Sequence, residues 1–263
     1  MSRECEAPQF CFTGDLDWAP ESMVDEVVSF FNGEGIPFTP FITHRSESIE
    51  RNYGGGKDKY VGLHPNFVFD TTHGKNMGEI VSNCIQLWPT AKCFRSHYYV
   101  DSLLINQHFY NWGFKYDSNM CLLLKENIVP QSLVSGLFRF PVFFEDILYV
   151  DKVGTYDLEH IRDRLLSGGL KIFNVHPMHF CINTPTLEHY TKNKHELYLN
   201  EKWEPHIFGG RGIRTLITDI VDFIKEEKMN TFYLEELYQT HRKNHEDVGL
   251  SPFFMKKTLG DSR

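Results

Sequence analysis

Short apolar runs alternate with longer amphipathic stretches along most of this 263-residue chain. Apolar runs of four to seven residues between turn residues are typical of buried strands, and a spacing of three to four residues is typical of helices. The pattern predicts strands at 9–13, 60–63, 91–94, 137–140, 148–150 and 169–175. It predicts helices at 21–32, 76–87, 100–112, 158–167 and 212–228.

This alternation of strands and helices predicts an α/β protein with parallel strands, because each parallel crossover needs a connecting helix. A (β/α) barrel and a doubly wound sheet both fit, and periodicity does not choose between them. No repeat or linker interrupts the chain, so we expect residues 1–263 to form a single domain. The polar segment 187–212 is expected to be an inserted loop of the kind that covers binding sites, and 43–59 is a weaker loop candidate.

The composition fits a globular protein, with 41% hydrophobic and 24% charged residues. A net charge of −8 gives no basic surface for nucleic acid, so no nucleic-acid partner is expected. The amino terminus lacks the pattern of a signal peptide, and no stretch is apolar enough for a membrane span. We therefore expect a cytoplasmic protein. Its six cysteines include no CxxC pair and are expected to be free thiols: Cys5, Cys11, Cys84, Cys93, Cys121 and Cys181.

Two carboxylates follow the first predicted strand, at Asp15 and Asp17. In an extended chain, residues two apart share a face. Carboxylates placed in this way repel each other unless a cation lies between them or one of them is protonated. The structural alternative is that Asp17 or Ser22 caps the helix that follows.

Two predicted strands end in a His-Pro pair, at His64 and at His176. The proline prevents further ladder hydrogen bonding, so each histidine marks a strand end. A single His-Pro is more often a structural turn. Two such pairs in one chain, each after a buried strand, favour a functional role, since active sites of parallel α/β proteins form at strand ends.

A third strand end carries Arg95 and His97, which would share a face by the same spacing of two. The structural alternative is an ion pair between Arg95 and Asp101. Further along, Glu145 and Asp146 lie inside a hydrophobic segment, where an unpaired acid is costly. One of these two acids is expected to face a cavity or to pair with an arginine, either Arg95 or Arg139.

Aspartate oxygen and imidazole nitrogen together suit zinc, and also manganese, iron, cobalt or nickel. Three protein ligands leave a position open for water and substrate. A metal there would polarise a carbonyl and acidify water, and nearby carboxylate and imidazole groups could move protons. His73 and His179 lie close to these motifs in the sequence and are reserve ligands.

At these residues the sequence resembles the polysaccharide deacetylase (NodB-homology) family, in particular its WbmS-type branch. The resemblance implies a distorted (β/α) barrel with motifs at successive strand ends. It implies that Asp15 is the general base and Asp17 a metal ligand. His64 is similar to the first histidine of the family's second motif, but Val68 stands where that motif has its second histidine.

The departure at Val68 leads us to expect that His97 completes the metal site with Asp17 and His64. The resemblance further implies that Arg95 orients the base and that His176 is the general acid. Candidate substrate-binding residues are Asp146, Trp18 and Asn66.

The function expected from this resemblance is metal-dependent removal of an N-acyl group, most simply acetyl, from an amino sugar or a sugar precursor. Zinc is the expected metal, and the expected partner is a small-molecule or oligosaccharide amino-sugar substrate. Two alternatives stay open. One is a nucleotide-sugar glycosyltransferase that binds its metal through Asp15 and Asp17, and the other is a non-catalytic carbohydrate-binding relative, which the loss at Val68 would explain.

Overall fold

The computed structural model describes residues 7–68, 71–199 and 202–247. Its strands are β1 (Pro8–Asp15), β2 (Phe38–Ile42), β3 (Gly62–Leu63), β4 (Cys93–Phe94), β5 (Tyr116–Asp117), β6 (Gln131–Ser132), β7 (Phe138–Arg139), β8 (Phe144–Glu145) and β9 (Gly169–Asn174). They form one sheet in the order β6-β7-β5-β4-β3-β2-β1-β9-β8. Every pair is parallel except β6 with β7.

One stretch of chain joins the two sides of this curved sheet. β7 pairs with β5, and just after it the Phe140 N–H donates to Asp117 O at 2.8 Å. The same stretch then crosses to the other side, where the Phe143 N–H donates to Ile172 O at 2.8 Å and β8 pairs with β9. The expected distorted (β/α) barrel is therefore confirmed, and several of its strands are only two residues long.

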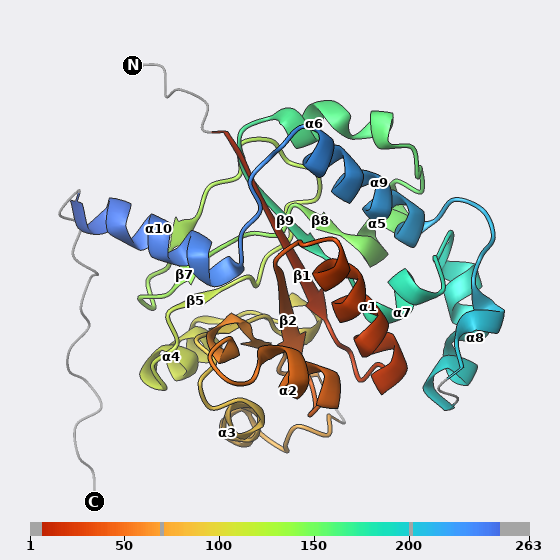
Figure 1. Ribbon diagram of the computed structural model, residues 1–263. Helices are drawn as coiled ribbons and strands as arrows, with labels where there is room; N and C mark the ends of the chain where they lie inside the picture. The colour runs from red at the N-terminus through yellow and green to blue at the C-terminus, as the bar shows by residue number, and fades with distance from the viewer. Residues whose placement is uncertain (1–6, 69–70, 200–201, 248–263) are drawn as a thin grey trace, which may run out of the picture.

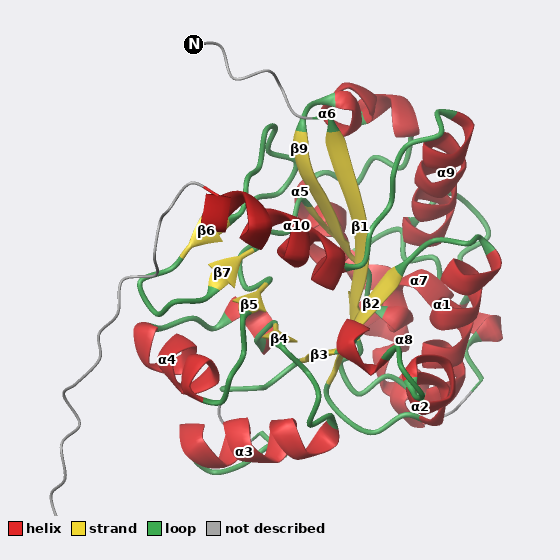
Figure 2. Cartoon of the chain, turned by 60° about the vertical axis from the view of Figure 1, so that its left-hand side comes forward, coloured by secondary structure: helices red, strands yellow, loops and turns green. Residues whose placement is uncertain are grey.

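Helices α1, α2, α3, α4 and α9 lie outside the strands, as Figure 2 shows, whereas α10 lies across one end of the barrel. The described helices have the following bounds. They are α1 (Glu21–Gly33), α2 (Glu47–Tyr53), α3 (Met77–Leu87), α4 (Leu103–Asn111), α5 (Asp146–Lys152), α6 (Arg162–Leu166), α7 (Pro177–Cys181), α8 (Leu187–Leu199), α9 (Ile213–Glu226) and α10 (Leu234–Asp247). Phenylalanine stacking joins helix and sheet: the ring of Phe31 on α1 lies 4.7 Å from that of Phe38 and 5.1 Å from that of Phe12. None of the helices within the described ranges is long and apolar enough to cross a membrane.

The amino ends of the strands are covered by α10 and the segment before it (Figure 1). The Phe232 N–H donates to Phe10 O at 2.9 Å. On α10, the Tyr238 ring stacks 4.7 Å from that of Tyr116 and lies 5.9 Å from that of Phe138, at the first positions of β5 and β7. Functional side chains are therefore left to the opposite, carboxyl ends of the strands.

Three sequence expectations about local structure were wrong. Residues 148–150, expected as a strand, lie in α5, where the Glu145 carboxylate caps the helix by accepting the Leu148 N–H at 2.6 Å. The segment 187–212, expected as a loop, contains helix α8 in its first half. The loop candidate 43–59 contains α2. Strand β2 and the two-residue strands β5, β6 and β8 were not predicted.

The cysteine expectation holds for five of the six residues, which are free thiols, while Cys5 lies outside the described residues.

Candidate active site

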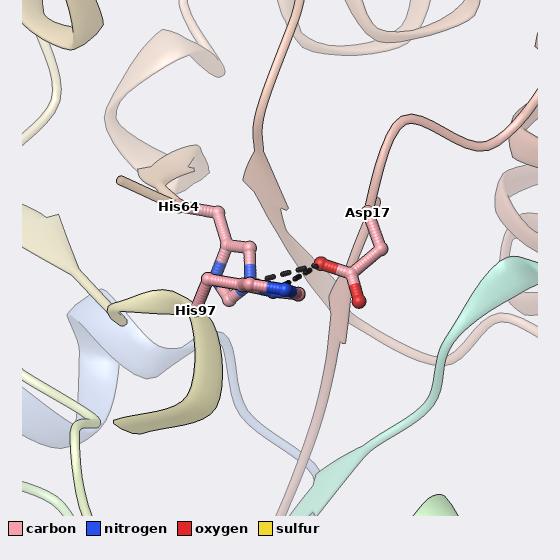
Figure 3. Close-up of side chains that lie close together, drawn as sticks. All are labelled: Asp17, His64 and His97. Carbon is pink, nitrogen blue, oxygen red and sulfur yellow. Dashed lines mark hydrogen bonds and ion pairs between the residues drawn. The ribbon is translucent and has the colours of Figure 1, made fainter. Parts of the chain in front are cut away.

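Three side chains from separate strand ends meet at the carboxyl side of the barrel. Asp17 follows β1, His64 follows β3 and His97 follows β4. Asp17 Oδ1 lies 3.1 Å from His64 Nε2 and 3.0 Å from His97 Nδ1, and the two nitrogens are 3.4 Å apart. Figure 3 shows both imidazole rings approaching the same carboxylate oxygen. The structure therefore brings together the three residues that the sequence proposed as metal ligands.

Backbone hydrogen bonds extend beyond the ends of the strands and hold this arrangement. His64 N donates to Ile42 O at 2.8 Å, and His97 N donates to Pro65 O at 2.9 Å. Each residue after a strand therefore remains in register with the neighbouring chain, because the parallel ladder continues past the regular strand. Asp17 is placed by a turn, since its φ of 44° is left-handed.

The three donor atoms fit a divalent metal ion. Donors about 2.0–2.1 Å from a tetrahedral zinc ion lie about 3.3–3.4 Å from one another, close to the separations here. Asp17 Oδ1 is buried, and the two imidazole nitrogens 3.0 and 3.1 Å from it do not bond it with hydrogen-bond geometry. Such an arrangement is costly unless an ion or water satisfies the oxygen. Burial alone would raise the pKa of Asp17, but its contacts with His64 and His97 hold that pKa well below the usual value. The lowered pKa favours an ionised Asp17 carboxylate, the form that could bind a metal ion.

The helix-capping alternative for this motif is wrong. The N-cap position of α1 is occupied by Pro20, so neither Asp17 nor Ser22 caps the helix.

Asp15 and Arg95 form a buried ion pair directly beside the three donors. Arg95 is fully buried, and its Nη1 donates to Asp15 Oδ1 at 2.9 Å. The other Asp15 oxygen accepts from Asn174 Nδ2 at 2.8 Å. The proposed alternative partner Asp101 instead binds Arg139, at 2.7 Å. Asp15 is thus fixed from two sides, as expected for a base that Arg95 orients.

Further polar groups fix Arg95 itself. Its Nε donates to Ser118 O at 3.0 Å, and its Nη2 donates to Ser118 Oγ at 2.8 Å and to Thr13 Oγ1 at 2.9 Å. The guanidinium is therefore held by strands β1 and β5 as well as by its own strand.

His176 faces the same site from the end of β9. Its Nε2 lies 3.6 Å from Asp17 Oδ2 and 3.9 Å from Asp15 Oδ2. Its Nδ1 lies 2.6 Å from Asp146 Oδ1, and its backbone N–H donates to Asp146 Oδ2 at 2.6 Å. Burial would lower the pKa of His176, but Asp146 raises it well above 6.5. His176 is therefore protonated near neutral pH, with Nε2 directed toward the two site aspartates.

Asp146 is itself fully buried and both its oxygens contact His176. This position favours an orienting role over the substrate contact expected from the sequence. Neither expected arginine partner reaches it, since Arg95 and Arg139 bind other acids. The neighbouring Glu145 also approaches His176, with Oε1 3.7 Å from Nδ1, and burial followed by the Asp146 charge raises the pKa of Glu145 to about 7.

The two remaining substrate-binding candidates differ in position. Trp18 is half-buried and its ring lies 5.7 Å from that of His97, so it lines the metal-ligand side of the site. The Asn66 side-chain oxygen accepts the Val68 N–H at 2.8 Å and thereby supports its own loop. Val68 is 37% exposed, in line with the loss of a ligand at that position.

The two reserve histidines lie outside the group of three donors. His73 bridges two backbone groups: Nδ1 accepts the Asn66 N–H at 3.0 Å and Nε2 lies 2.8 Å from Thr43 O. His179 is buried, and burial lowers its pKa to about 4. Its Nδ1 lies 3.1 Å from Thr184 Oγ1.

The sequence indicated that the segment 116–119, which contains Ser118, could supply polar contacts, but it did not indicate the two other groups that support Asp15 and Arg95, namely Thr13 and Asn174. A signal was present for Asn174, because it is a polar residue at the end of an otherwise apolar predicted strand. Sequence reasoning also missed Tyr198 on α8, whose hydroxyl donates to Asp17 O at 3.3 Å.

Comparison with known proteins agrees with this geometry. Residues 12–194 match the family described as WbmS-like polysaccharide deacetylase. The fold is similar to a crystal structure from Bordetella bronchiseptica, WbmS, named as a candidate polysaccharide deacetylase involved in O-antigen biosynthesis. The two share 23% sequence identity with a TM-score of 0.73, over 81% of this chain and 90% of that one. No curated protein matches the chain. Since the family match spans more than half of its length, the chain belongs to the WbmS-like polysaccharide deacetylase family.

Proposed function

We propose that the protein is a metal-dependent hydrolase that removes an N-acetyl group from an amino sugar, either in a surface polysaccharide or in its precursor. The observation that carries this proposal is the position of two proton-transfer groups beside one set of three donors. Asp15 Oδ1 lies 3.5 Å from His64 Nδ1, and His176 Nε2 lies 3.6 Å from Asp17 Oδ2. Family membership supports the deacetylase reaction, and the O-antigen role named for WbmS supports a polysaccharide-related substrate.

Asp17, His64 and His97 would hold the metal, with zinc as the expected ion. When bound, a divalent ion supplies Lewis acidity toward the acyl carbonyl and lowers the pKa of water. The proton transfers are carried out by residues of the chain, Asp15 and His176.

In the proposed reaction, water attacks the carbonyl carbon of the amide and Asp15 accepts the proton that water loses. An ionised carboxylate has about four lone-pair sites, so the bonds from Arg95 and Asn174 leave Asp15 able to accept. His176 then donates a proton to the sugar nitrogen as the C–N bond breaks. The products are acetate and the free amine.

The glycosyltransferase alternative requires that Asp15 and Asp17 both bind the metal of a nucleotide diphosphate. Asp15 does not belong to the set of three donors, which argues against that use. The non-catalytic alternative assumes that Val68 leaves the metal site one ligand short. His97 supplies a third donor beside Asp17 and His64, which argues against this alternative.

Acetate release tests the proposal. The protein, purified without chelator, is incubated with N-acetylated hexosamines as free sugars, nucleotide-linked sugars and short oligosaccharides. We expect acetate from at least one class, loss of release after metal removal, and recovery on adding zinc. Full activity in protein stripped of metal would overturn metal dependence. Metal binding that appears only when a nucleoside diphosphate is added would favour the transferase.

A further inference from the structure

His179 is a buried histidine that the proposed reaction does not use. It lies on α7, one helical turn after His176, and only 1% of it is exposed. Its Nδ1 lies 3.1 Å from Thr184 Oγ1, but its Nε2 is buried and has no hydrogen-bond partner in the part of the chain that the structure describes. Burial lowers its pKa to about 4, so the imidazole is neutral near pH 7. Buried polar atoms without a partner are rare, and they often mark the place of a water or a ligand.

Packing holds the His179 ring in one orientation. The Tyr190 ring on α8 lies 4.2 Å from it, and the Tyr190 hydroxyl donates to Met178 Sδ at 3.5 Å. The His176 ring lies 5.9 Å away and meets it edge-on. A backbone bond adds to the side-chain contact with Thr184, whose N–H donates to His179 O at 3.0 Å. Since Nδ1 lies at Thr184, Nε2 is the polar atom of the ring that is left for a ligand.

A small cavity connects His179 with the active site. Its volume is about 20 Å³, and the polar part of its lining comes from His179, Asp17 and His176. This volume is enough for one water-sized group. Much of the remaining wall is apolar and is formed by Leu16, Ile147 and Met178. The cavity therefore presents an unpaired imidazole nitrogen in largely apolar surroundings, beside a proposed metal ligand and the proposed general acid.

The acyl chain is the part of the substrate that fits this cavity. In the proposed reaction the amide nitrogen lies at His176 and the carbonyl group lies at the donors that include Asp17. The acyl chain is the remaining substituent of the carbonyl carbon, and a cavity bordered by both residues is within its reach. An acetyl group leaves space for a water at Nε2 of His179. An acyl group that is one atom longer displaces that water, and only a terminal hydroxyl replaces the lost hydrogen bond.

We infer that His179 selects the acyl group, and that the protein accepts N-hydroxyacetyl amino sugars, whose terminal hydroxyl bonds to Nε2, in preference to other acyl groups of the same length. This inference rests on the proposed function and extends it from acetyl to a second acyl group. The reaction is otherwise the same: water adds to the carbonyl carbon, the C–N bond breaks, and His176 protonates the nitrogen. The products are hydroxyacetate and the free amine.

A comparison of acyl groups tests the inference on protein purified without chelator. The probes are glucosamine and galactosamine with N-acetyl, N-hydroxyacetyl or N-propionyl groups, as free sugars, as uridine diphosphate sugars and in short oligosaccharides. Propionyl has the size of hydroxyacetyl but ends in a methyl group, so the two differ only in the bond to Nε2. Formation of the free amine gives kcat/KM for every probe. We expect hydroxyacetyl to exceed propionyl about 10-fold or more, because propionyl leaves a buried nitrogen unpaired.

His179→Leu should abolish this preference, because leucine fills the position without a hydrogen-bonding group. His179→Gln restores such a group and should retain part of the preference. The matched control is His195→Leu, since His195 is exposed on α8, and it should keep the wild-type ratio.

Equal kcat/KM for hydroxyacetyl and propionyl in the wild type, with acetyl cleaved, would overturn the inference and leave the proposed function in place. A preference that survives in His179→Leu would also overturn it. If His179→Leu does not fold, the ratios of the wild type and His179→Gln decide. Amine release from none of the probes would overturn the proposed function, and the inference with it.

Discussion

His64 Nε2 and His97 Nδ1 lie 3.4 Å apart, although the two residues are 33 positions apart in the chain. Both nitrogens also lie within 3.1 Å of one oxygen of Asp17. Two imidazole nitrogens directed at each other and at the same carboxylate need a cation or a proton between them. The relationship is therefore the structural basis for a metal prediction.

Replacing His97 with Ala should abolish stoichiometric metal binding. Protein purified without chelator should contain about one divalent ion per chain, because three donors from separate strand ends close one site. His97→Ala removes one of the three and leaves Asp17 with a single imidazole. Metal content by elemental analysis, and the rise in melting temperature on adding zinc, measure the change.

His108→Ala is the control for this measurement, since His108 is exposed on α4. It should bind metal as the wild type does. Equal metal content in His97→Ala and wild type would show that His97 is not a ligand.

Asp15→Asn should reduce the rate of deacetylation about 10²–10⁴-fold, the usual contribution of a general base, while metal is retained. The amide cannot accept a proton, but it does not belong to the set of three donors. Acetate release and metal content are measured on the same sample. Loss of metal together with activity would instead identify Asp15 as a ligand.

The site was more predictable from the sequence than the local structure around it. Six of the predicted site residues follow apolar runs: Asp15, Asp17, His64, Arg95, His97 and His176. Because the carboxyl ends of parallel strands lie at the same edge of a sheet, the topology brings these residues together. The contribution of α8 could not be predicted, since its apolar positions are too few to indicate a helix that packs on the site.

Two errors in the fold have local causes. Residues 148–150 are apolar and partly β-branched, and a three-residue window cannot separate a strand from a turn of helix. What favours the helix is the local N-cap at Glu145, whose carboxylate accepts the Leu148 N–H. β2 contains Pro40, and a proline in a sequence argues against a central strand. In the structure β2 nevertheless lies between β1 and β3, with Pro40 opposite Gly14 of β1.

Asp146→Asn should move the alkaline limb of the kcat/KM profile to lower pH. His176 must be protonated to donate, and after the opposing effect of burial it is Asp146 that raises its pKa well above 6.5. Without that charge His176 loses its proton at lower pH, so activity falls off earlier as pH rises. A pH profile of acetate release measures the shift.

The matching control is Asp151→Asn, an exposed acid on the same helix that pairs with Lys152. Its profile should match the wild type, and an unmoved limb in Asp146→Asn would contradict the orienting role of Asp146.

The raised pKa of His176 also makes the stability of the protein depend on pH, in a definite direction. Protonated His176 stabilises the fold fully at pH values below about 6.5, and this contribution is lost as pH rises through the folded-state pKa.

Arg95→Met should destabilise the protein by about 3–5 kcal/mol, because it leaves the Asp15 charge buried without its ionic partner. The free energy of unfolding from urea denaturation measures the loss. Arg51→Met is the control, since Arg51 pairs with Asp25 at an exposed position where an ion pair contributes about 0–1 kcal/mol. Similar losses in the two variants would mean that the buried pair has no special role in stability.

Gly14→Ala should lower stability by about 1–3 kcal/mol and reduce activity as well. A Cβ at Gly14 would lie 2.5 Å from Val175 O and 2.6 Å from Phe38 Cζ, and the carbonyl belongs to the backbone that carries His176. Relief of that clash must shift β1 away from the end of β9, which separates Asp15 from His176. Gly33→Ala is the matched control, because its Cβ would meet nothing within 4 Å at the end of α1. Thermal denaturation and acetate release are compared across the three proteins; a Gly14→Ala protein as stable and active as Gly33→Ala would show that the close approach of β1 and β9 is not needed.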